Sequence, residues 1–129
     1  MKRSIKPAPA KKTAAKMKLS SPQAFDLRRF CHYFAVGPEE VSRMTGAALR
    51  TVAYWKSGKE PNGLTQQKLK ELVHLFDALS DVIASKSIGP WLSLPNPAFD
   101  GSTPLQVIER GESHRIWRMI WELGSGQPD

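Results

Sequence analysis

The sequence has little of what most enzymes and exported proteins need. Its 129 residues contain one cysteine, Cys31, so no internal disulfide can form and a reducing compartment is expected. No apolar run is long enough for a signal peptide or a membrane span. The alternating pattern of β-strands is missing as well, and so are internal repeats. These absences favour a small, all-helical cytoplasmic protein.

Side chains for catalysis or metal binding are also sparse. His32, His74 and His114 are scattered, and none stands at ligand spacing with another histidine, cysteine or acid. Cys31 precedes His32, but neighbouring helical residues point about 100° apart, which disfavours a nucleophile–base pair. Cys31 is expected to be a core residue. We predict no enzyme activity, no metal and no cofactor.

Acidic residues are absent from the first 18 positions, which hold seven lysines and arginines. The whole chain has 19 basic and 12 acidic residues, so the remainder carries 12 of each and is neutral. Residues 1–20 cannot bury enough apolar surface to order themselves and are predicted to be a disordered basic tail. The tail is either a solubilising segment or an arm that follows DNA phosphates.

Apolar residues at helical spacing, together with capping residues, predict six helices. The first begins at Ser20-Ser21-Pro22 and is closed by Gly37, and the second begins at Pro38 and stops at Gly46. The others cover residues 48–56, 65–84, 105–110 and 112–123. The helix at 65–84, ended by Ser85, Ser87 and Gly89, is either a central core helix or a dimer interface.

Residues 38–57 have the spacing of a DNA-binding helix-turn-helix. Val41 and Ser42 occupy positions for one buried and one small residue, and Gly46 takes the turn, where a left-handed backbone favours glycine. Val52 and Trp55 are placed to pack the second helix on the first. A helical hairpin that touches no DNA would share this pattern.

The exposed side of the second helix offers residues that can read DNA. Arg50, Thr51 and Tyr54 can form hydrogen bonds with base edges or phosphates. Further contacts are expected from Lys56 and Lys59. Against DNA binding, Ala48 stands where a serine or threonine cap usually begins the recognition helix. The reading surface is also thin, because it includes Ala47, Ala48, Leu49 and Ala53. A single unit would bind weakly, and we predict a homodimer that reads two half-sites of operator DNA about one helical turn apart.

The stretch 91–108 is irregular but apolar. Its prolines and Gly101 exclude a long helix, while Trp91, Leu92, Leu94 and Phe99 must pack on something. Asn96-Pro97 predicts a turn, and Thr103-Pro104 predicts the capped start of a short helix. This stretch therefore joins a DNA-reading domain, residues 21–86, to a second domain, residues 87–124, followed by a frayed end at 125–129.

The same stretch resembles the toxin-binding domain of Xre/MbcA/ParS-type antitoxins. The matching residues are Trp91-Leu92, Pro95-Asn96-Pro97-Ala98-Phe99, Gly101, Thr103-Pro104-Leu105 and Val107-Ile108. With the helix-turn-helix before it, the resemblance covers about residues 25–123. Phe99, where the family often has leucine, and Asp100 are mild departures.

The resemblance implies a bacterial type II antitoxin, usually dimeric, whose partner is a RES-domain toxin that consumes NAD⁺. In that family the C-terminal region covers the toxin's active-site cleft, and the helix-turn-helix represses the antitoxin's own operon. NAD⁺ would be the partner's substrate and not a cofactor of this chain. The alternative is a stand-alone regulator of the phage-repressor type, in which the C-terminal region only dimerises.

The final helix is where we expect the toxin to bind, because tryptophan and arginine dominate binding hot spots. The candidate toxin-binding residues are Arg110, Glu112, His114, Arg115, Trp117, Arg118 and Trp121. The alternative is that Ile116, Ile120 and Leu123 face the core and the tryptophans extend it. Most motif residues between 91 and 104 are expected to be scaffolding that sets the angle of this helix.

Overall fold

A computed structural model describes residues 26–124, and these contain seven α-helices, one short 3-10 helix and no strand. The all-helical prediction is confirmed for this part of the chain. The helices are α2 (Leu27–Phe34), α3 (Pro38–Thr45), α4 (Leu49–Lys56), α5 (Gly63–Leu79), α6 (Ser85–Trp91), α7 (Pro104–Glu109) and α8 (Ser113–Gly124), with the 3-10 helix η1 (Pro97–Phe99) before α7. The predicted tail, the helix start at Ser20-Ser21-Pro22 and the end at 125–129 lie outside the described residues.

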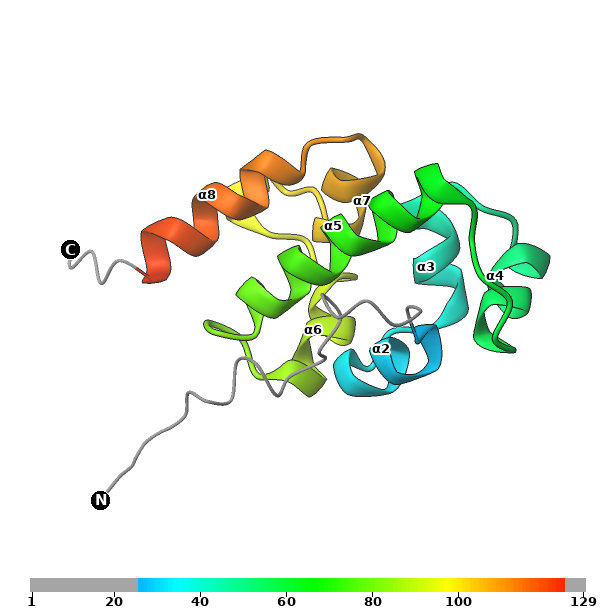
Figure 1. The fold of residues 1–129 in the computed structure, drawn as a ribbon. Coiled ribbons are helices and arrows are strands. Elements are labelled where there is room, and N and C mark those ends of the chain that lie inside the picture. The colour runs from blue at the N-terminus through cyan, green and yellow to red at the C-terminus, as the bar shows by residue number, and fades with distance from the viewer. Residues whose placement is uncertain (1–25, 125–129) are drawn as a thin grey trace, which may run out of the picture.

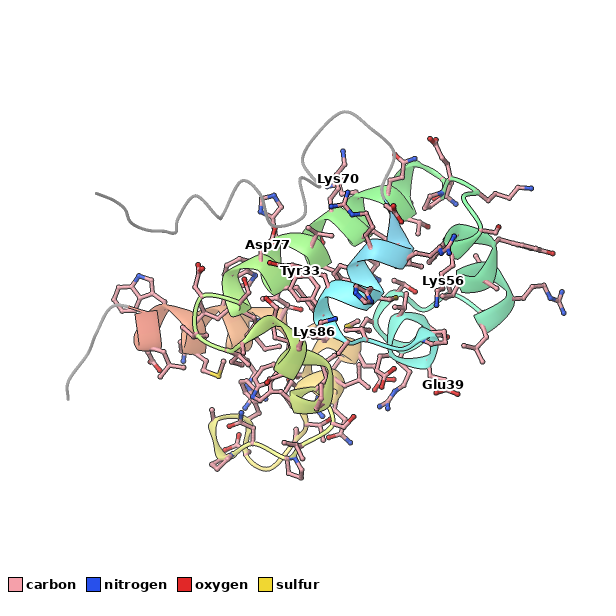
Figure 2. The ribbon with its side chains drawn as sticks, turned by 90° about the horizontal axis from the view of Figure 1, so that it is seen from below. Tyr33, Glu39, Lys56, Lys70, Asp77 and Lys86 are labelled. Atoms are coloured by element: carbon pink, nitrogen blue, oxygen red, sulfur yellow. The ribbon has the colours of Figure 1, made fainter. Side chains whose placement is uncertain are left out.

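Helix α5 runs through the middle of the fold, and the other helices pack around it (Figure 1). It contacts α3, α6 and α8, while α2 packs on α4 and α6, and α7 packs on α3 and α8. Figures 1 and 2 both place α4 and the C-terminal end of α8 at opposite ends of the molecule. The exposed parts of the two candidate binding helices therefore lie far apart.

One continuous core connects these helices. It contains Phe30, Phe34 and Phe76, whose rings lie 5.1–5.3 Å apart between centroids, and it extends to Ile116 of α8. Helix α5 buries side chains on several faces, including Leu69, Leu75 and Phe76, which supports the interpretation of this helix as a core element. Cys31 is buried in the same core, as expected. No described helix is long and apolar enough to cross a membrane.

The predicted closure of the first helix at Gly37 is wrong. Helix α2 ends at Ala35, which adopts a left-handed conformation with φ 58° and donates its N–H to the carbonyl of Cys31. Gly37 instead precedes α3, where its N–H donates to Oε1 of Glu40 at 3.0 Å. Val36, the residue directly after this turn, is buried in the core.

The predicted end of the long helix is also wrong. Helix α5 stops at Leu79, and Ser85–Trp91 forms the separate helix α6. Gly89 lies inside this helix, where it allows a close crossing with α2. A Cβ atom at this position would lie 1.8 Å from the carbonyl oxygen of Ala35. The glycine marks a helix contact and not a helix end, because only a residue without a side chain fits there.

The irregular stretch folds back on itself around Asn96. The side chain of Asn96 accepts the N–H of Ala98 at 2.9 Å, and its backbone pairs with Ser102 and Gly101. Thr103 then caps α7 by accepting the N–H of Gln106 at 3.1 Å, as predicted. Leu92 and Phe99 are buried and Trp91 is half-buried, but Leu94 is 58% exposed, so the prediction that it packs is wrong. The turn after α6 carries Leu94 away from the core.

Candidate functional site

Helices α3 and α4 form the helix-turn-helix that the spacing predicts. Gly46 closes α3 with φ 80°, in the left-handed region. The hydroxyl of Ser42 donates to the carbonyl of Ala47 at 2.6 Å, which ties the turn to the first helix. Val52 and Trp55 of α4 are buried in the core, 0% and 8% exposed. The turn is thus held by the residues that the pattern singled out.

The outward face of α4 carries Arg50, Thr51 and Tyr54. Arg50 and Tyr54 are exposed and Thr51 is half-buried. Lys59 follows the helix, and its Nζ lies 5.8 Å from the centre of the Tyr54 ring, a cation–π contact that joins these two residues. Lys56 does not join them: it lies on the side of α4 that faces α2 (Figure 2).

Helix α8 leaves its two tryptophans in solvent. Trp117 is 42% exposed and Trp121 is 68% exposed, and Leu123 is 58% exposed at the end of the helix. Only Ile116 is fully buried, while Met119 and Ile120 are partly buried against the core. The alternative in which Ile116, Ile120 and Leu123 all face the core is therefore wrong at Leu123. The helix is anchored at its start and presents an apolar, aromatic surface towards its end.

Three of the candidate toxin-binding residues form ion pairs within the fold. Glu112 accepts from Arg115 at 3.1 Å and lies 3.3 Å from Arg110, which also donates to the hydroxyl of Ser102 at 3.1 Å. Arg115 reaches further, to Oδ2 of Asp100 at 3.0 Å, and its guanidinium carbon lies 5.8 Å from the centre of the Phe99 ring. Hydrogen bonds from Arg115 and then Arg110 lower the pKa of Glu112.

This network joins the start of α8 to the loop around Asn96. We call Asp100, Arg110, Glu112 and Arg115 the α8 brace. In the sequence, Asp100 is only a mild departure from the family pattern, and nothing near it indicates that it pairs with Arg115. No local signal gives this pairing, because Asp100 and Arg115 meet only once the loop has folded. Of the seven candidate toxin-binding residues, Arg110, His114, Trp117, Arg118 and Trp121 are exposed, and Arg110 among them belongs to the brace.

A second ion pair connects the helix-turn-helix to α7. Arg43 of α3 holds Glu109 with two hydrogen bonds, from Nε at 2.8 Å and from Nη2 at 2.6 Å. The hydrogen bond from Arg43 lowers the pKa of Glu109, and the pKa of Arg43 is raised by the same bond. Both residues border a groove of about 410 Å³ between α3, α5 and the start of α8, with Trp117 at its rim.

The described residues contain no group of three or more histidines, cysteines or acids that could hold a metal ion. Burial raises the pKa of the Cys31 thiol, which disfavours the thiolate that a nucleophile or a metal ligand requires.

Comparison with known proteins gives a consistent set of relatives. No protein-family model matches the chain. It is 32% identical over 89 residues to the mycobacterial cidal antitoxin MbcA of Mycobacterium tuberculosis and of Mycobacterium bovis, which covers 68% of this chain and 79% of the relative. The fold is similar to a chain in the crystal structure of the M. tuberculosis MbcT–MbcA toxin–antitoxin complex. The TM-score is 0.65 at 27% identity, over 78% of this chain and 92% of that one.

Proposed function

The chain belongs to the MbcA family of antitoxins, and we propose that it neutralises a RES-type, NAD⁺-consuming toxin by covering the toxin's active site with α8. The observation that carries this proposal is the pair of exposed tryptophans on α8, in a fold that resembles a chain of a toxin–antitoxin complex. Large aromatic side chains in solvent are costly unless a partner covers them.

The brace supports this assignment because it explains how α8 holds its position. A contact helix binds best when it is already in its bound orientation, since ordering it on binding costs free energy. Arg115 fixes the first turn of α8 to the loop at Asp100, and Ile116 anchors the helix in the core. The exposed half of α8, with Arg118 between the two tryptophans in sequence, is then free to enter a cleft.

The experiment is co-expression with the product of the adjacent reading frame. We expect that product to stop growth when expressed alone, to deplete cellular NAD⁺, and to co-purify with this chain. A neighbouring product that is harmless and does not bind would refute the proposal. It would favour the stand-alone regulator, in which the C-terminal region only dimerises.

We also propose that α4 binds the operator of its own operon, as a homodimer. Arg50, Thr51 and Tyr54 lie on one exposed face of a well-formed helix-turn-helix. Ala48 gives no side-chain cap, so the first N–H groups of α4 have no side-chain acceptor among the described residues. A DNA phosphate is an acceptor that fits this position.

Substitution of Arg50 tests this second proposal. Arg50→Ala should weaken operator binding roughly tenfold or more and leave binding to random duplex nearly unchanged, because a lost base contact costs about 1–3 kcal/mol. Gel-shift titration of both duplexes measures the ratio. An unchanged operator affinity would remove Arg50 from the interface.

A further inference from the structure

A concave surface of about 840 Å³ lies between α2 and α4. We call it the α2–α4 basin. Its charged and polar lining is Asp26, Arg28, Arg29, His32, Tyr33 and Lys56. We propose that this basin is a second contact surface for the DNA phosphate backbone, beside the face of α4 that reads the operator. The inference rests on the proposed operator binding and extends it to a surface on α2.

The charges in the basin favour an anionic ligand. Arg28 and Arg29 are exposed, and neither they nor Lys56 form an ion pair with any carboxylate in the described part of the chain. The carboxylate in the basin, Asp26, already accepts the N–H of Arg29 at 3.2 Å, where it caps α2. Three cations therefore face one engaged acid.

Other arginines of this protein do find carboxylates. Arg43, Arg110 and Arg115 are each paired with at least one acid at 2.6–3.3 Å. The arginines that join elements of the fold are thus paired with carboxylates, whereas the arginines of the basin remain available to an external ligand. Guanidinium groups bind phosphate oxygens with two parallel hydrogen bonds, which suits them to a nucleic-acid backbone.

The basin is continuous with the proposed DNA-reading helix. Lys56 belongs to α4 and lies on the side of that helix that faces α2, as Figure 2 shows. The Lys56 charge partly opposes the increase in the pKa of Cys31 that burial causes, which agrees with a cation close to α2. Because Lys56, Arg28 and Arg29 line the same basin, a DNA strand whose phosphates reach Lys56 would lie close to both arginines. Phosphates there would position the duplex and carry no sequence information.

Two other occupants fit less well. A small ligand needs an enclosed and largely apolar pocket, whereas this basin is open and has flexible arginines at its edge. An acidic protein surface would be most useful beside the partner-binding helix. Helix α8, however, ends on the far side of the molecule from α4 (Figure 1).

The test compares the salt dependence of DNA binding by the full chain and by the double variant Arg28→Gln/Arg29→Gln. The logarithm of the binding constant falls linearly with the logarithm of salt concentration, with a slope of about 0.9 per phosphate contact. We expect the double variant to reduce this slope by about two and to bind roughly tenfold more weakly. The loss should be equal on operator and random duplex.

Matched variants make the result specific. Arg28→Lys/Arg29→Lys keeps both charges and should keep most of the slope. Lys68→Gln removes one exposed charge from α5, beside the Trp117 groove, and should leave the slope unchanged. Thermal unfolding should be the same for all variants, because the substituted side chains are exposed.

Three outcomes would overturn the inference. If the double variant keeps the wild-type slope while the wild type binds DNA, the basin is not a phosphate site and operator binding by α4 stands. If the variant instead loses affinity for the toxin, the basin binds an acidic protein surface. If the wild-type chain binds no duplex at any salt concentration, the proposed operator binding fails together with this inference.

Discussion

The two ends of the molecule differ in how most of their arginines are held. At the α2–α4 end, Arg28, Arg29 and Arg50 are exposed and form no ion pair within the described residues. At the α7–α8 end, Arg110 and Arg115 are held by Glu112 and Asp100, and Arg118 alone is exposed without such a pair in the described part of these helices. The first set is available to an external anion, and the second set holds the protein's own loop against its last helix.

Tryptophan shows the reverse distribution. Trp55 of α4 is buried in the core, whereas Trp117 and Trp121 of α8 are exposed. One end therefore presents charge and the other presents aromatic surface. Residue type alone therefore does not determine the role of an arginine or a tryptophan in this fold. What decides is whether the fold already supplies a partner for the side chain.

The largest effect is expected at the tryptophans of α8. Trp117→Ala/Trp121→Ala should weaken toxin binding roughly a thousandfold, because each hot-spot tryptophan contributes about 2 kcal/mol or more. Operator affinity should not change, since α4 lies at the other end. Titration calorimetry with purified toxin measures the first value and gel shift the second.

The matched control removes exposed apolar surface elsewhere. Leu64 of α5 is 84% exposed, and Leu64→Ala should leave toxin affinity within about twofold of the wild-type value. An equal loss in both variants would show that general surface hydrophobicity, and not α8, holds the toxin.

The next effect concerns the contact between α2 and α6, which joins the two ends through the core. Gly89→Ala should lower the free energy of unfolding by about 3 kcal/mol, because the new methyl group would overlap the Ala35 carbonyl. Unlike the tryptophan variant, it should impair toxin and operator binding together. Urea denaturation measures the loss. Gly63→Ala, with no atom within 4 Å of the new Cβ, should be close to neutral and serves as control.

The α8 brace predicts a smaller effect on toxin binding. Arg115→Gln and Asp100→Asn should each weaken toxin binding a few-fold. The double variant should be no worse than Arg115→Gln alone, since that substitution already removes the contact with Asp100. If Arg115 instead met the toxin directly, Asp100→Asn would free it and would not weaken binding. A double-mutant cycle of toxin affinities separates the two cases.

The smallest effect is expected at the Arg43–Glu109 pair, which is largely exposed. Glu109→Gln should lower the free energy of unfolding at pH 7 by about 0.5 kcal/mol. The pKa of Glu109 is lowered in the folded state, so the pair stabilises the fold above the unfolded pKa of about 4.3. That contribution disappears as the pH falls through the lower folded value. Denaturation of both proteins between pH 7 and pH 3 should show the difference vanish on acidification.

Much of the fold could be predicted because its signals are local. Pro38, Gly46 and the Thr103 cap define helix ends within a few residues, and the spacing of Val41, Val52 and Trp55 defines the helix-turn-helix. Gly89 was misinterpreted because its reason lies at Ala35, far away in the sequence. Sequence alone cannot distinguish a glycine that ends a helix from one that admits a neighbour.

In the candidate site, too, only the features with local signals could be predicted. Exposure of Trp117 and Trp121 follows from helical spacing once Ile116 is placed in the core. The pairing of Arg115 with Asp100 does not, because it depends on the loop between them. A chain that ended at Gly111 would test α8 poorly, because it would lose the buried Ile116 and the core would be disturbed.

The central claim is that toxin neutralisation depends on the exposed face of α8 and not on the DNA-reading end. The most direct measurement is rescue of growth in cells that express the toxin together with variants of the full chain. The account predicts that Arg50→Ala rescues growth as the wild type does, while Trp117→Ala/Trp121→Ala accumulates to the same level and fails to rescue. Full rescue by the tryptophan variant would contradict it.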